Sequence, residues 1–337
     1  MCNNQFCSIV PPFILEELAK RGNTQCKIAL NDAHRLYQKR KTALNHLLQK
    51  DDKENNGERY VYDSENKYEQ RVTLLRKENE DPVDDITTNT VYDKTGFVRD
   101  YFKNTFSVNS IDDNGMDIIS NIRYGKNYNN AYWDGDEMTF GEGDKVQFKD
   151  FTGAIDIIAH EMTHGITQFT ENLDYYGQSG ALNEHFSDVF GTVIKQKFLR
   201  HDLDSADWLI GDAIVTEKFP GKAIRSMKAP GTANDFDRQP DHMDNYYTGN
   251  DDNQGVHINS GIPNRAFYLT AMELGLDTSA LLWFKTLKKL WRTANFNDLS
   301  DKILETAIQM VEEEKLDKKA LDIVKECFAK VGLSKAI

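Results

Sequence analysis

Apolar residues recur at helical spacing through the second half of the chain. Residues 152–169 carry one such stripe, formed by Ile155, Ile158, Ala159, Met162, Ile166 and Phe169. Comparable spacing recurs in five later segments, over residues 179–198, 264–275, 279–291, 299–314 and 318–332. Apolar positions with this period place one face of each helix against a core. The pattern therefore predicts a mainly helical region from residue 154 onward, interrupted by an Asp-, Gly- and Pro-rich loop region over 201–256.

The preceding hundred or so residues have a different pattern, with short β-prone segments separated by Gly, Asn and Asp. Segments 59–65, 71–78, 117–125 and 130–144 indicate strands, and 93–106 indicates one helix. The first 50 residues are separate again, with a Pro-Pro turn that leads into a helix ending near Gly22 and a second helix over 31–50. A polar, charged stretch without periodicity follows, which is typical of an exposed linker that proteases cut.

These segments predict an α+β protein with two lobes and a short helical leader. We divide the chain into a leader over residues 1–50, a linker and processing region over 51–58, a β-rich lobe over 59–153 and an α-helical lobe over 154–337.

Charge and cysteine content indicate which partners and which cellular compartment to expect. With 41 Lys+Arg against 54 Asp+Glu, the net charge is −13, so we expect neither nucleic acid nor a membrane as a partner. No apolar run approaches the ~18–20 residues of a membrane span. The N-terminal sequence lacks the basic and apolar regions of an ordinary secretory signal, and the 4 cysteines have no framework spacing. We therefore expect a cytoplasmic protein, or one exported without an ordinary signal peptide.

The motif "HEMTH", of the form HExxH, lies on the first predicted helix of the second half. His160 and His164 are four residues apart and project from one helix face, with Cβ atoms ~5–6 Å apart. Both imidazoles can therefore reach one Zn²⁺ ion. Glu161 is rotated ~100° around the helix, too far to be a ligand in good geometry but able to reach a water on the metal.

A catalytic zinc needs a third protein ligand and leaves its fourth position to water. The next predicted helix contains Glu184 and Asp188 on one face. From spacing alone, either carboxylate could bind the ion while the other accepts the second N–H of a ligand histidine. A pair of exposed helix acids is the alternative.

The motifs "HEMTH" and "GALNEHFSD" together resemble those of the thermolysin family of zinc metallopeptidases. Three further stretches resemble family motifs in the same order: "NNAYWDGDEMTFGEGD", "AIRSM" and "DNQGVHINSGIPNRAFYL". The resemblance extends from about residue 59 to the C-terminus. It implies a two-lobed fold with the active-site cleft between the lobes, and a protease that hydrolyses protein or peptide substrates.

The resemblance also implies a role for each matching residue. His160, His164 and Glu184 are the implied zinc ligands, with Asp188 orienting His160. Glu161 is the implied general base, then acid. His257 and Tyr175 match the groups that stabilise the oxyanion, with Asp252 holding His257.

Other matching positions bear on substrate and calcium. Asn130, Ala131 and Arg225 match the residues that hold the substrate backbone. A pocket of large apolar residues implies cleavage on the amino side of Leu, Phe, Ile or Val; these residues are Phe148, Phe151, Ile157, Ile210, Ile214 and Ile224. Lys195 and Leu209 replace two glutamates of the family's double calcium site, so we expect at most one Ca²⁺ there.

The leader resembles that of the protealysin-like branch, whose short propeptides carry a Pro-Pro-x-x-Leu motif. Here the motif is Pro11, Pro12 and Leu15. We therefore expect a zymogen whose propeptide inhibits its own catalytic region until the linker is cut, between Leu48 and Tyr62. Cys7 lies beside the motif, and a thiolate there could block the zinc, but an idle thiol is commoner.

Two other functions remain open. An aminopeptidase also uses HExxH with a distant glutamate, but it needs an acidic group for the free amine of its substrate, and the sequence has no dedicated motif for one. A catalytically idle binding protein on the same scaffold is the second alternative.

Overall fold

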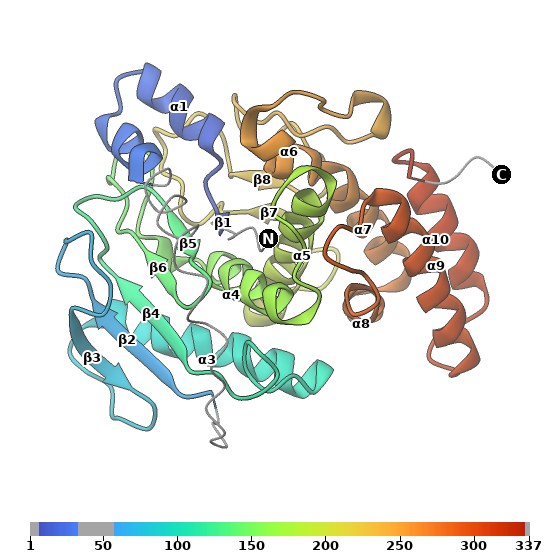
Figure 1. Ribbon diagram of the computed structural model, residues 1–337, viewed down its shortest axis with the longest axis horizontal. Helices are drawn as coiled ribbons and strands as arrows, with labels where there is room; N and C mark the ends of the chain where they lie inside the picture. Colours follow the sequence, from blue (N-terminus) through green and yellow to red (C-terminus); the bar gives the residue numbers. More distant parts are fainter. Residues whose placement is uncertain (1–6, 33–56, 334–337) are drawn as a thin grey trace.

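The computed structural model describes residues 7–32 and 57–333, and Figure 1 shows a β-rich lobe beside a helical one. The predicted α+β class and two-lobed architecture are confirmed. In the described part of the chain, one six-stranded sheet has the order β1-β5-β6-β4-β2-β3. Its strands are β1 (Cys7–Ser8), β2 (Arg59–Asp63), β3 (Thr73–Lys77), β4 (Ile118–Ile122), β5 (Ala131–Trp133) and β6 (Met138–Phe140). The β2–β4 and β4–β6 pairs are parallel, and the other pairs are antiparallel.

Helix α3 (Ile86–Phe106) packs between this sheet and the helical lobe. It begins seven residues before the predicted helix at 93–106, because Asp85 caps it. The Asp85 side chain accepts hydrogen bonds from Thr87 N at 3.2 Å and Thr88 Oγ1 at 2.6 Å. An N-cap of this kind satisfies backbone donors that the first turn leaves free.

The helical lobe is built around α4 and α5, which share the most extensive helix–helix contact among the described residues. Its helices are α4 (Ile155–Thr170), α5 (Gly177–Leu199), α6 (Asp251–Asn259), α7 (Gly261–Leu274), α8 (Leu276–Leu287), α9 (Phe296–Glu312) and α10 (Lys319–Ala329). Nearly the whole of α5 between Gly177 and Gln196 is buried, so α5 is the central helix of the lobe.

Two glycines allow α4 to pack closely against its neighbours. A Cβ on Gly165 would lie 2.6 Å from Ile111 Cγ2 and 3.1 Å from the Trp133 indole. A Cβ on Gly191 would lie 3.0 Å from the Asp156 carbonyl oxygen. Larger residues would push α4 away from β5 or α5, because a packed core has no room for added atoms. These close contacts hold α4, the helix that carries the HExxH motif, against the β-rich lobe on one side and against α5 of its own lobe on another.

The 201–256 region contains more structure than a loop. The short strands β7 (Leu209–Ile210) and β8 (Arg225–Ser226) pair antiparallel, and η2 (Met243–Asn245) is a 3₁₀ turn. A further 3₁₀ turn, η1 (Phe151–Gly153), lies outside this region, directly before α4. Strand β8 is the element that places Arg225.

The described part of the leader is docked on the catalytic region. It contains β1 and α1 (Pro12–Lys20), and residues 24–32 are also helical. Its contacts include Asn23 Nδ2 to Asp144 Oδ2 at 2.6 Å and Tyr124 Oη to Asp32 Oδ2 at 3.1 Å. Most of the expected helix over 31–50 and most of the linker lie outside the described residues. Leu48 and the expected cut near it lie outside them as well.

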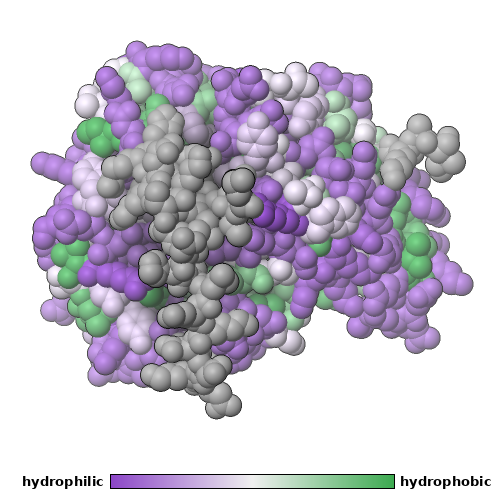
Figure 2. All heavy atoms as spheres, in the orientation of Figure 1, coloured by the Kyte–Doolittle hydropathy of each residue, from purple (hydrophilic) through white to green (hydrophobic). Residues whose placement is uncertain are grey.

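The face of the molecule in Figure 2 is mainly hydrophilic, in keeping with the net charge of −13. Among the described residues, no helix has the length and hydropathy that a membrane span requires.

Candidate active site

Three buried side chains from α4 and α5 form the candidate metal centre. Potential ligand atoms of His160, His164 and Glu184 all lie within 4.8 Å of one another. The Nε2 atoms of the two histidines are 2.9 Å apart, and each is near a Glu184 oxygen, at 3.5 Å for His160 and 3.4 Å for His164. The cluster joins one turn of α4 to the facing turn of α5.

The partners of the two imidazoles favour a bound cation. His164 Nδ1 faces Asn183 Oδ1 at 2.7 Å, and His160 Nδ1 lies 3.0 Å from Asp188 Oδ1. Because an oxygen acceptor selects the tautomer with its proton on Nδ1, both Nε2 atoms then carry lone pairs that point at each other. Glu184 Oε2 is buried and has no hydrogen-bond partner among the described residues. Two lone pairs and an unpaired carboxylate oxygen fit a Zn²⁺ site with two nitrogen ligands and one oxygen ligand.

Asp188 connects the metal cluster to Arg225. The Arg225 guanidinium donates two hydrogen bonds to the Asp188 carboxylate, at 2.9 and 2.8 Å, and Asn264 Nδ2 donates a third at 2.9 Å. Despite complete burial, the positive charge of Arg225 and the contact with His160 hold the pKa of Asp188 well below its usual range. Asp188 is therefore an ionised acceptor for His160.

Glu161 lies beside the cluster without belonging to it. Its Oε2 atom accepts the backbone N–H of Trp133 at 2.8 Å, which ties α4 to β5. Burial, and then the charge of Glu184, raise its pKa well above the usual range. The backbone N–H of Ile9 offsets part of this rise, although Glu161 Oε1 has no direct hydrogen bond among the described residues. A carboxyl of raised pKa can exchange a proton near neutral pH.

His257 and Tyr175 lie against Glu184 of the cluster. Tyr175 Oη donates a short hydrogen bond to Glu184 and lies 3.1 Å from His257 Nε2. Asp252 accepts from His257 Nδ1 at 2.6 Å and from its backbone N–H at 2.8 Å. Burial lowers the pKa of His257, but Asp252 and Glu184 outweigh this effect and raise it to about 9. At neutral pH both ring nitrogens therefore carry protons.

The local backbone explains how Asp252 reaches His257. Residues Asp252 to Gly255 all have positive φ, between 52° and 78°, so the chain makes a left-handed turn before the regular part of α6. This unusual backbone returns the Asp252 carboxylate to the first N–H groups of the helix. Such strained segments persist where the surrounding contacts hold them.

Strand β5 runs along the cluster and binds the leader. Asn130 Oδ1 accepts from Val10 N at 3.0 Å, and Asn130 Nδ2 donates to the Val10 carbonyl at 3.3 Å. The Ala131 carbonyl accepts from Ile9 N at 3.2 Å, and Arg225 donates to the Ile9 carbonyl at 2.9 Å. All three residues expected to hold substrate backbone thus hold the backbone of the leader.

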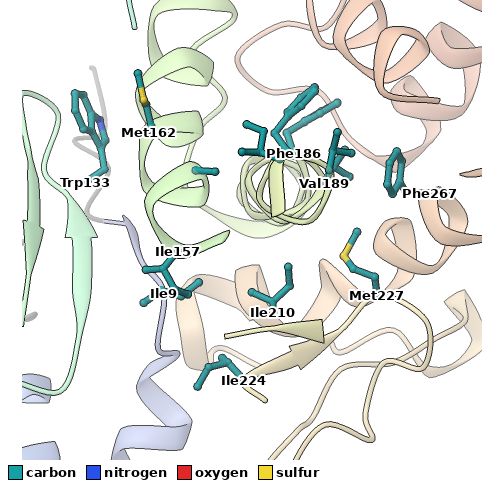
Figure 3. Close-up of a cluster of buried hydrophobic side chains, with 14 of the residues drawn as sticks. Ile9, Trp133, Ile157, Met162, Phe186, Val189, Ile210, Ile224, Met227 and Phe267 are labelled. Carbon is teal, nitrogen blue, oxygen red and sulfur yellow. The ribbon is translucent and has the colours of Figure 1, made fainter. Parts of the chain in front are cut away.

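The expected apolar pocket is buried at every position. Its six residues, Phe148, Phe151, Ile157, Ile210, Ile214 and Ile224, are each 0% exposed. Figure 3 shows Ile9 beside Ile157, on the side where Ile210 and Ile224 lie. The Ile9 side chain is itself 0% exposed, so the leader contributes an apolar side chain to this group.

Lys195 occupies the cluster of acids that the resemblance associates with calcium. Its Nζ donates to Asp207 at 3.0 Å, to Asp212 at 2.5 Å and to the Leu209 carbonyl at 3.1 Å. Asp156 Oδ2 is 4.0 Å away. Burial lowers the pKa of Lys195, but these carboxylates raise it by more, so the ammonium stays charged.

Sequence reasoning brought together the metal ligands and the groups around them but missed four contacts. On α5, Asn183 and Ser187 both contact His164 Nδ1, with Ser187 Oγ 3.0 Å away. On α7, Asn264 donates a hydrogen bond to Asp188. For Asn183 and Ser187 the available signal was their nearness to Glu184 in "GALNEHFSD", and for Asn264 it was its place in "DNQGVHINSGIPNRAFYL". Ser8 was also missed: its carbonyl is 2.9 Å from His257 Nε2. The side chain of Cys7, in contrast, is not part of the metal cluster in the described residues; it packs with Tyr175 and Val256.

Two profiles of one protein family match this chain. The profile described as thermolysin metallopeptidase, catalytic domain, matches residues 18–168, and the profile described as thermolysin metallopeptidase, alpha-helical domain, matches residues 171–333.

Similar proteins match over nearly the full chain. An extracellular metalloprotease of Pectobacterium carotovorum subsp. carotovorum is 36% identical, covering 99% of this chain and 98% of its own length. Protease PrtS of Photorhabdus sp. (strain Az29) is 35% identical over 98% of this chain and 94% of its own. The solved precursor of protealysin, a metalloproteinase from Serratia proteamaculans, has a TM-score of 0.84 at 36% identity, covering 97% of this chain and 100% of that chain.

The expected cytoplasmic location is contradicted by these relatives, because the P. carotovorum protein is extracellular. The error came from taking the lack of a disulfide framework as a sign of a reducing compartment. A chain of 337 residues can bury a core large enough to be stable without disulfides, so the absence of a disulfide framework does not indicate a reducing compartment.

Proposed function

The chain belongs to the thermolysin family of zinc metallopeptidases, and from this premise we propose that it is a neutral endopeptidase made as an inactive precursor. It cleaves peptide bonds on the amino side of bulky hydrophobic residues. One observation carries this proposal: the leader backbone is bound beside the His160, His164 and Glu184 cluster, with the Ser8 carbonyl 2.9 Å from His257 Nε2 and the Ile9 carbonyl 2.9 Å from Arg225 Nη1. We further propose that the protein acts outside the cell, like its extracellular relative.

His160, His164 and Glu184 hold the zinc in this proposal. When bound there, zinc lowers the pKa of its water toward ~7 and so supplies a nucleophile at neutral pH. Asp188 holds His160 in the required tautomer, as outer carboxylates do for ligand histidines.

Glu161 acts as general base and then as acid. Its Oε2 atom is held by the N–H of Trp133 on β5, the strand to which the Ile9 N–H of the leader also donates, through Ala131, and a substrate bound like the leader would have its leaving nitrogen there. Its raised pKa suits a group that accepts a proton from water and returns it to that nitrogen.

His257 and Tyr175 stabilise the oxyanion. His257 Nε2 lies 2.9 Å from a peptide carbonyl of the leader, and Tyr175 Oη lies 3.1 Å from His257 Nε2. Donors aimed at the developing negative charge are worth a few kcal/mol each. Asp252 fixes the orientation of His257.

Asn130, Ala131 and Arg225 bind the substrate backbone, because they bind the extended leader in the same way that an added strand binds a sheet edge. The side chain that follows the cut bond enters the pocket that contains Ile157, Ile210 and Ile224.

Residues 7–15 of the leader make it an intramolecular inhibitor. They fill the substrate positions, and Phe13, Ile14 and Leu15 are buried at 7% exposure or less. We propose residues 1–50 as the propeptide, 51–58 as the processing region, 59–153 and 154–337 as the two catalytic lobes, and a cut between Leu48 and Tyr62.

Wild-type protein should convert on storage to a species that starts in that interval, while Glu161→Ala purified alone stays full length. Equal trimming of both, with contaminating proteases inhibited, would assign the cut to another enzyme.

We propose that the Lys195 cluster binds no Ca²⁺, because the ammonium already neutralises Asp207 and Asp212. Heat stability that depends on calcium is therefore not expected.

The aminopeptidase alternative is disfavoured by the path of the leader. Cys7 pairs with Trp133 upstream of the Ser8 carbonyl, so the cleft accepts chain on the amino side of the bond at the metal cluster. An aminopeptidase closes that side to capture a free amine. Hydrolysis of an N-blocked peptide by the processed protein, lost on chelation, tests the choice. Hydrolysis only of unblocked peptides would favour the aminopeptidase, and no hydrolysis of either would favour the idle binding protein.

A further inference from the structure

The leader crosses the candidate active site as an added strand. β1 pairs antiparallel with β5, with Cys7 opposite Trp133 and Ser8 opposite Tyr132. Ile9 extends the pairing through its hydrogen bond to the Ala131 carbonyl at 3.2 Å. The direction of the leader relative to β5 is therefore fixed over three successive residues.

Each carbonyl from Ser8 to Val10 has its own partner. The Ser8 carbonyl lies 2.9 Å from His257 Nε2, the Ile9 carbonyl accepts from Arg225 at 2.9 Å, and the Val10 carbonyl accepts from Asn130 at 3.3 Å. A shift of one residue would reverse the faces of all these groups. The register therefore assigns the Ser8 carbonyl to the metal cluster, since His257 Nε2 is also 3.4 Å from Glu184 Oε1.

The nitrogen of the same peptide bond faces the strand that holds the proposed base. The Ile9 N–H donates to the Ala131 carbonyl of β5 at 3.2 Å, and two residues further along β5 the Trp133 N–H holds Glu161 Oε2 at 2.8 Å. The Ser8–Ile9 bond thus has its carbonyl at the oxyanion donors and its nitrogen on the strand that positions the proton carrier.

The side chain that follows this bond is of the type the pocket accepts. Ile9 is 0% exposed and lies beside Ile157, with Ile210 and Ile224 on the same side (Figure 3). Val10 has its backbone held by Asn130 instead, one residue further from the metal cluster. The Ser8–Ile9 bond therefore combines the position of a cleaved bond with the proposed side-chain preference.

We infer that the enzyme hydrolyses the Ser8–Ile9 bond within its own chain, before the leader is released. The inference rests on the proposed function. The oxygen of a water molecule bonds to the Ser8 carbonyl carbon, and the bond from that carbon to the Ile9 nitrogen breaks. The proton that Glu161 takes from the water passes to the Ile9 nitrogen. The products are a Ser8 carboxylate and an amine on Ile9, so water is the only other reactant.

The cut leaves the leader in place. Beyond Ile9, the chain is anchored by Asn130, by the buried residues of α1 and by the Asn23–Asp144 hydrogen bond. A chain that begins at Ile9 therefore stays bound as a product, and cutting of the linker remains necessary for activity. Because both reacting parts belong to one chain, the reaction is first order, and its rate constant is independent of protein concentration.

The test starts with full-length protein purified free of zinc and then given one equivalent. Intact mass and N-terminal sequence are followed over time at protein concentrations that differ by about tenfold. We expect wild type to yield a chain starting at Ile9 with a half-life that does not change with protein concentration, and Glu161→Gln to remain uncut. A half-life that shortens in proportion to the concentration would overturn the inference, because the cut would then occur between molecules.

Substitutions at Ile9 test the pocket. Ile9→Leu should be cut within a few-fold of the wild-type rate, while Ile9→Asp, which puts a carboxylate among Ile157 and its neighbours, should be cut at least ten times more slowly. Equal rates for the two variants would overturn the assignment of Ile9 to the pocket.

Labelling of Cys7 in the zinc-free protein gives a readout that does not depend on catalysis. Cys7 is 0% exposed while the leader is docked, so a thiol reagent located by peptide mass mapping should spare it in wild type and Ile9→Leu and modify it in Ile9→Asp. Rapid labelling of Cys7 in wild type would overturn the docked register itself.

Hydrolysis of an N-blocked peptide by the same zinc-loaded samples distinguishes failure of the Ser8–Ile9 inference from failure of the proposed endopeptidase function. If Ile9→Asp or storage-processed protein cleaves the peptide while wild type keeps Ser8–Ile9 intact with Cys7 protected, the inference is wrong and the proposed function stands. If none of the samples cleaves the peptide, the proposed function fails as well.

Discussion

Two clusters of charged or metal-binding side chains lie along the same pair of helices, one fully buried and one partly exposed, and they are completed in different ways. In the first, His160 and His164 of α4 face Glu184 of α5, with the nitrogen lone pairs pointing inward. In the second, Asp156 of α4 and Lys195 of α5 meet carboxylates from the following region. Asp156 is one helical turn before His160, so both clusters use one face of α4.

The difference lies in the source of the positive charge. The histidine cluster offers lone pairs and an unpaired Glu184 oxygen, which need an ion from outside. The Lys195 cluster carries its cation on the chain, hydrogen-bonded to Asp207, Asp212 and the Leu209 carbonyl. An exchangeable Lewis acid suits catalysis, whereas a covalently attached ammonium suits structure, because it cannot dissociate or bind water as a nucleophile.

Removing and replacing metal ions should give the largest difference in behaviour between the two clusters. Removing zinc from processed protein with a chelator should abolish peptide hydrolysis, and zinc should restore it while calcium does not. The melting temperature of the zinc-reloaded protein should be the same with and without millimolar calcium. A calcium-dependent rise in melting temperature would mean that the Lys195 cluster still binds the ion.

Lys195→Met should destabilise the protein by up to ~3 kcal/mol, because it leaves the buried Asp156 and the partly exposed Asp207 and Asp212 without their cation. Lys197→Met is the matched control on the same helix. Its ion pair with Asp277 is exposed, at 36% and 70% for the two side chains, so the expected cost is ~0–1 kcal/mol. Urea unfolding of the three proteins measures both values. Equal stability of Lys195→Met and Lys197→Met would show that the ammonium does not hold the cluster together.

At the histidine cluster, one donor should affect turnover. His257→Phe should lower kcat by ~10²–10³-fold with a smaller effect on KM, because an oxyanion donor acts mainly on the transition state. Lys195→Met, assayed well below its melting temperature, should keep kcat within a few-fold of wild type. A rise in KM alone for His257→Phe would make His257 a substrate-binding group.

The pH dependence of the Lys195 cluster should be the smallest effect. The pKa of Lys195 is raised above its model-compound value of 10.5, so its contribution to stability is fully present below that value and is lost only as pH rises through the higher folded pKa. The difference in melting temperature between wild type and Lys195→Met should therefore stay constant from about pH 7 to about pH 10. A difference that shrinks in this range would mean that burial dominates the titration of Lys195.

The sequence predicted the helices better than the contacts between them. The stripe on residues 152–169 anticipated α4 closely, because burial of one face requires that period. The start of α3 was missed, since the Asp85 cap lies before the periodic part. Strands β7 and β8 were missed because two-residue strands leave no alternating pattern.

In the site, spacing alone placed His160 and His164 on one face but left Glu184 and Asp188 interchangeable. Only the packing of α4 on α5 separates them, with Glu184 at the Nε2 atoms and Asp188 at His160 Nδ1. The position of the leader could not be read from local patterns either. It depends on contacts between residues more than a hundred positions apart, such as Ser8 with His257 and Ile9 with Arg225.

The central claim is that His160, His164 and Glu184 hold the zinc while the adjacent Glu161 does the proton transfer. Wild type and Glu161→Gln, each with its leader removed by the same added protease, are compared for zinc content by elemental analysis and for hydrolysis of one N-blocked peptide. We predict one zinc per chain in both proteins and loss of at least ~10²-fold in kcat for the variant. Near-normal turnover at equal zinc content would contradict the account, and so would loss of zinc from Glu161→Gln, because Glu161 would then be a ligand rather than the base.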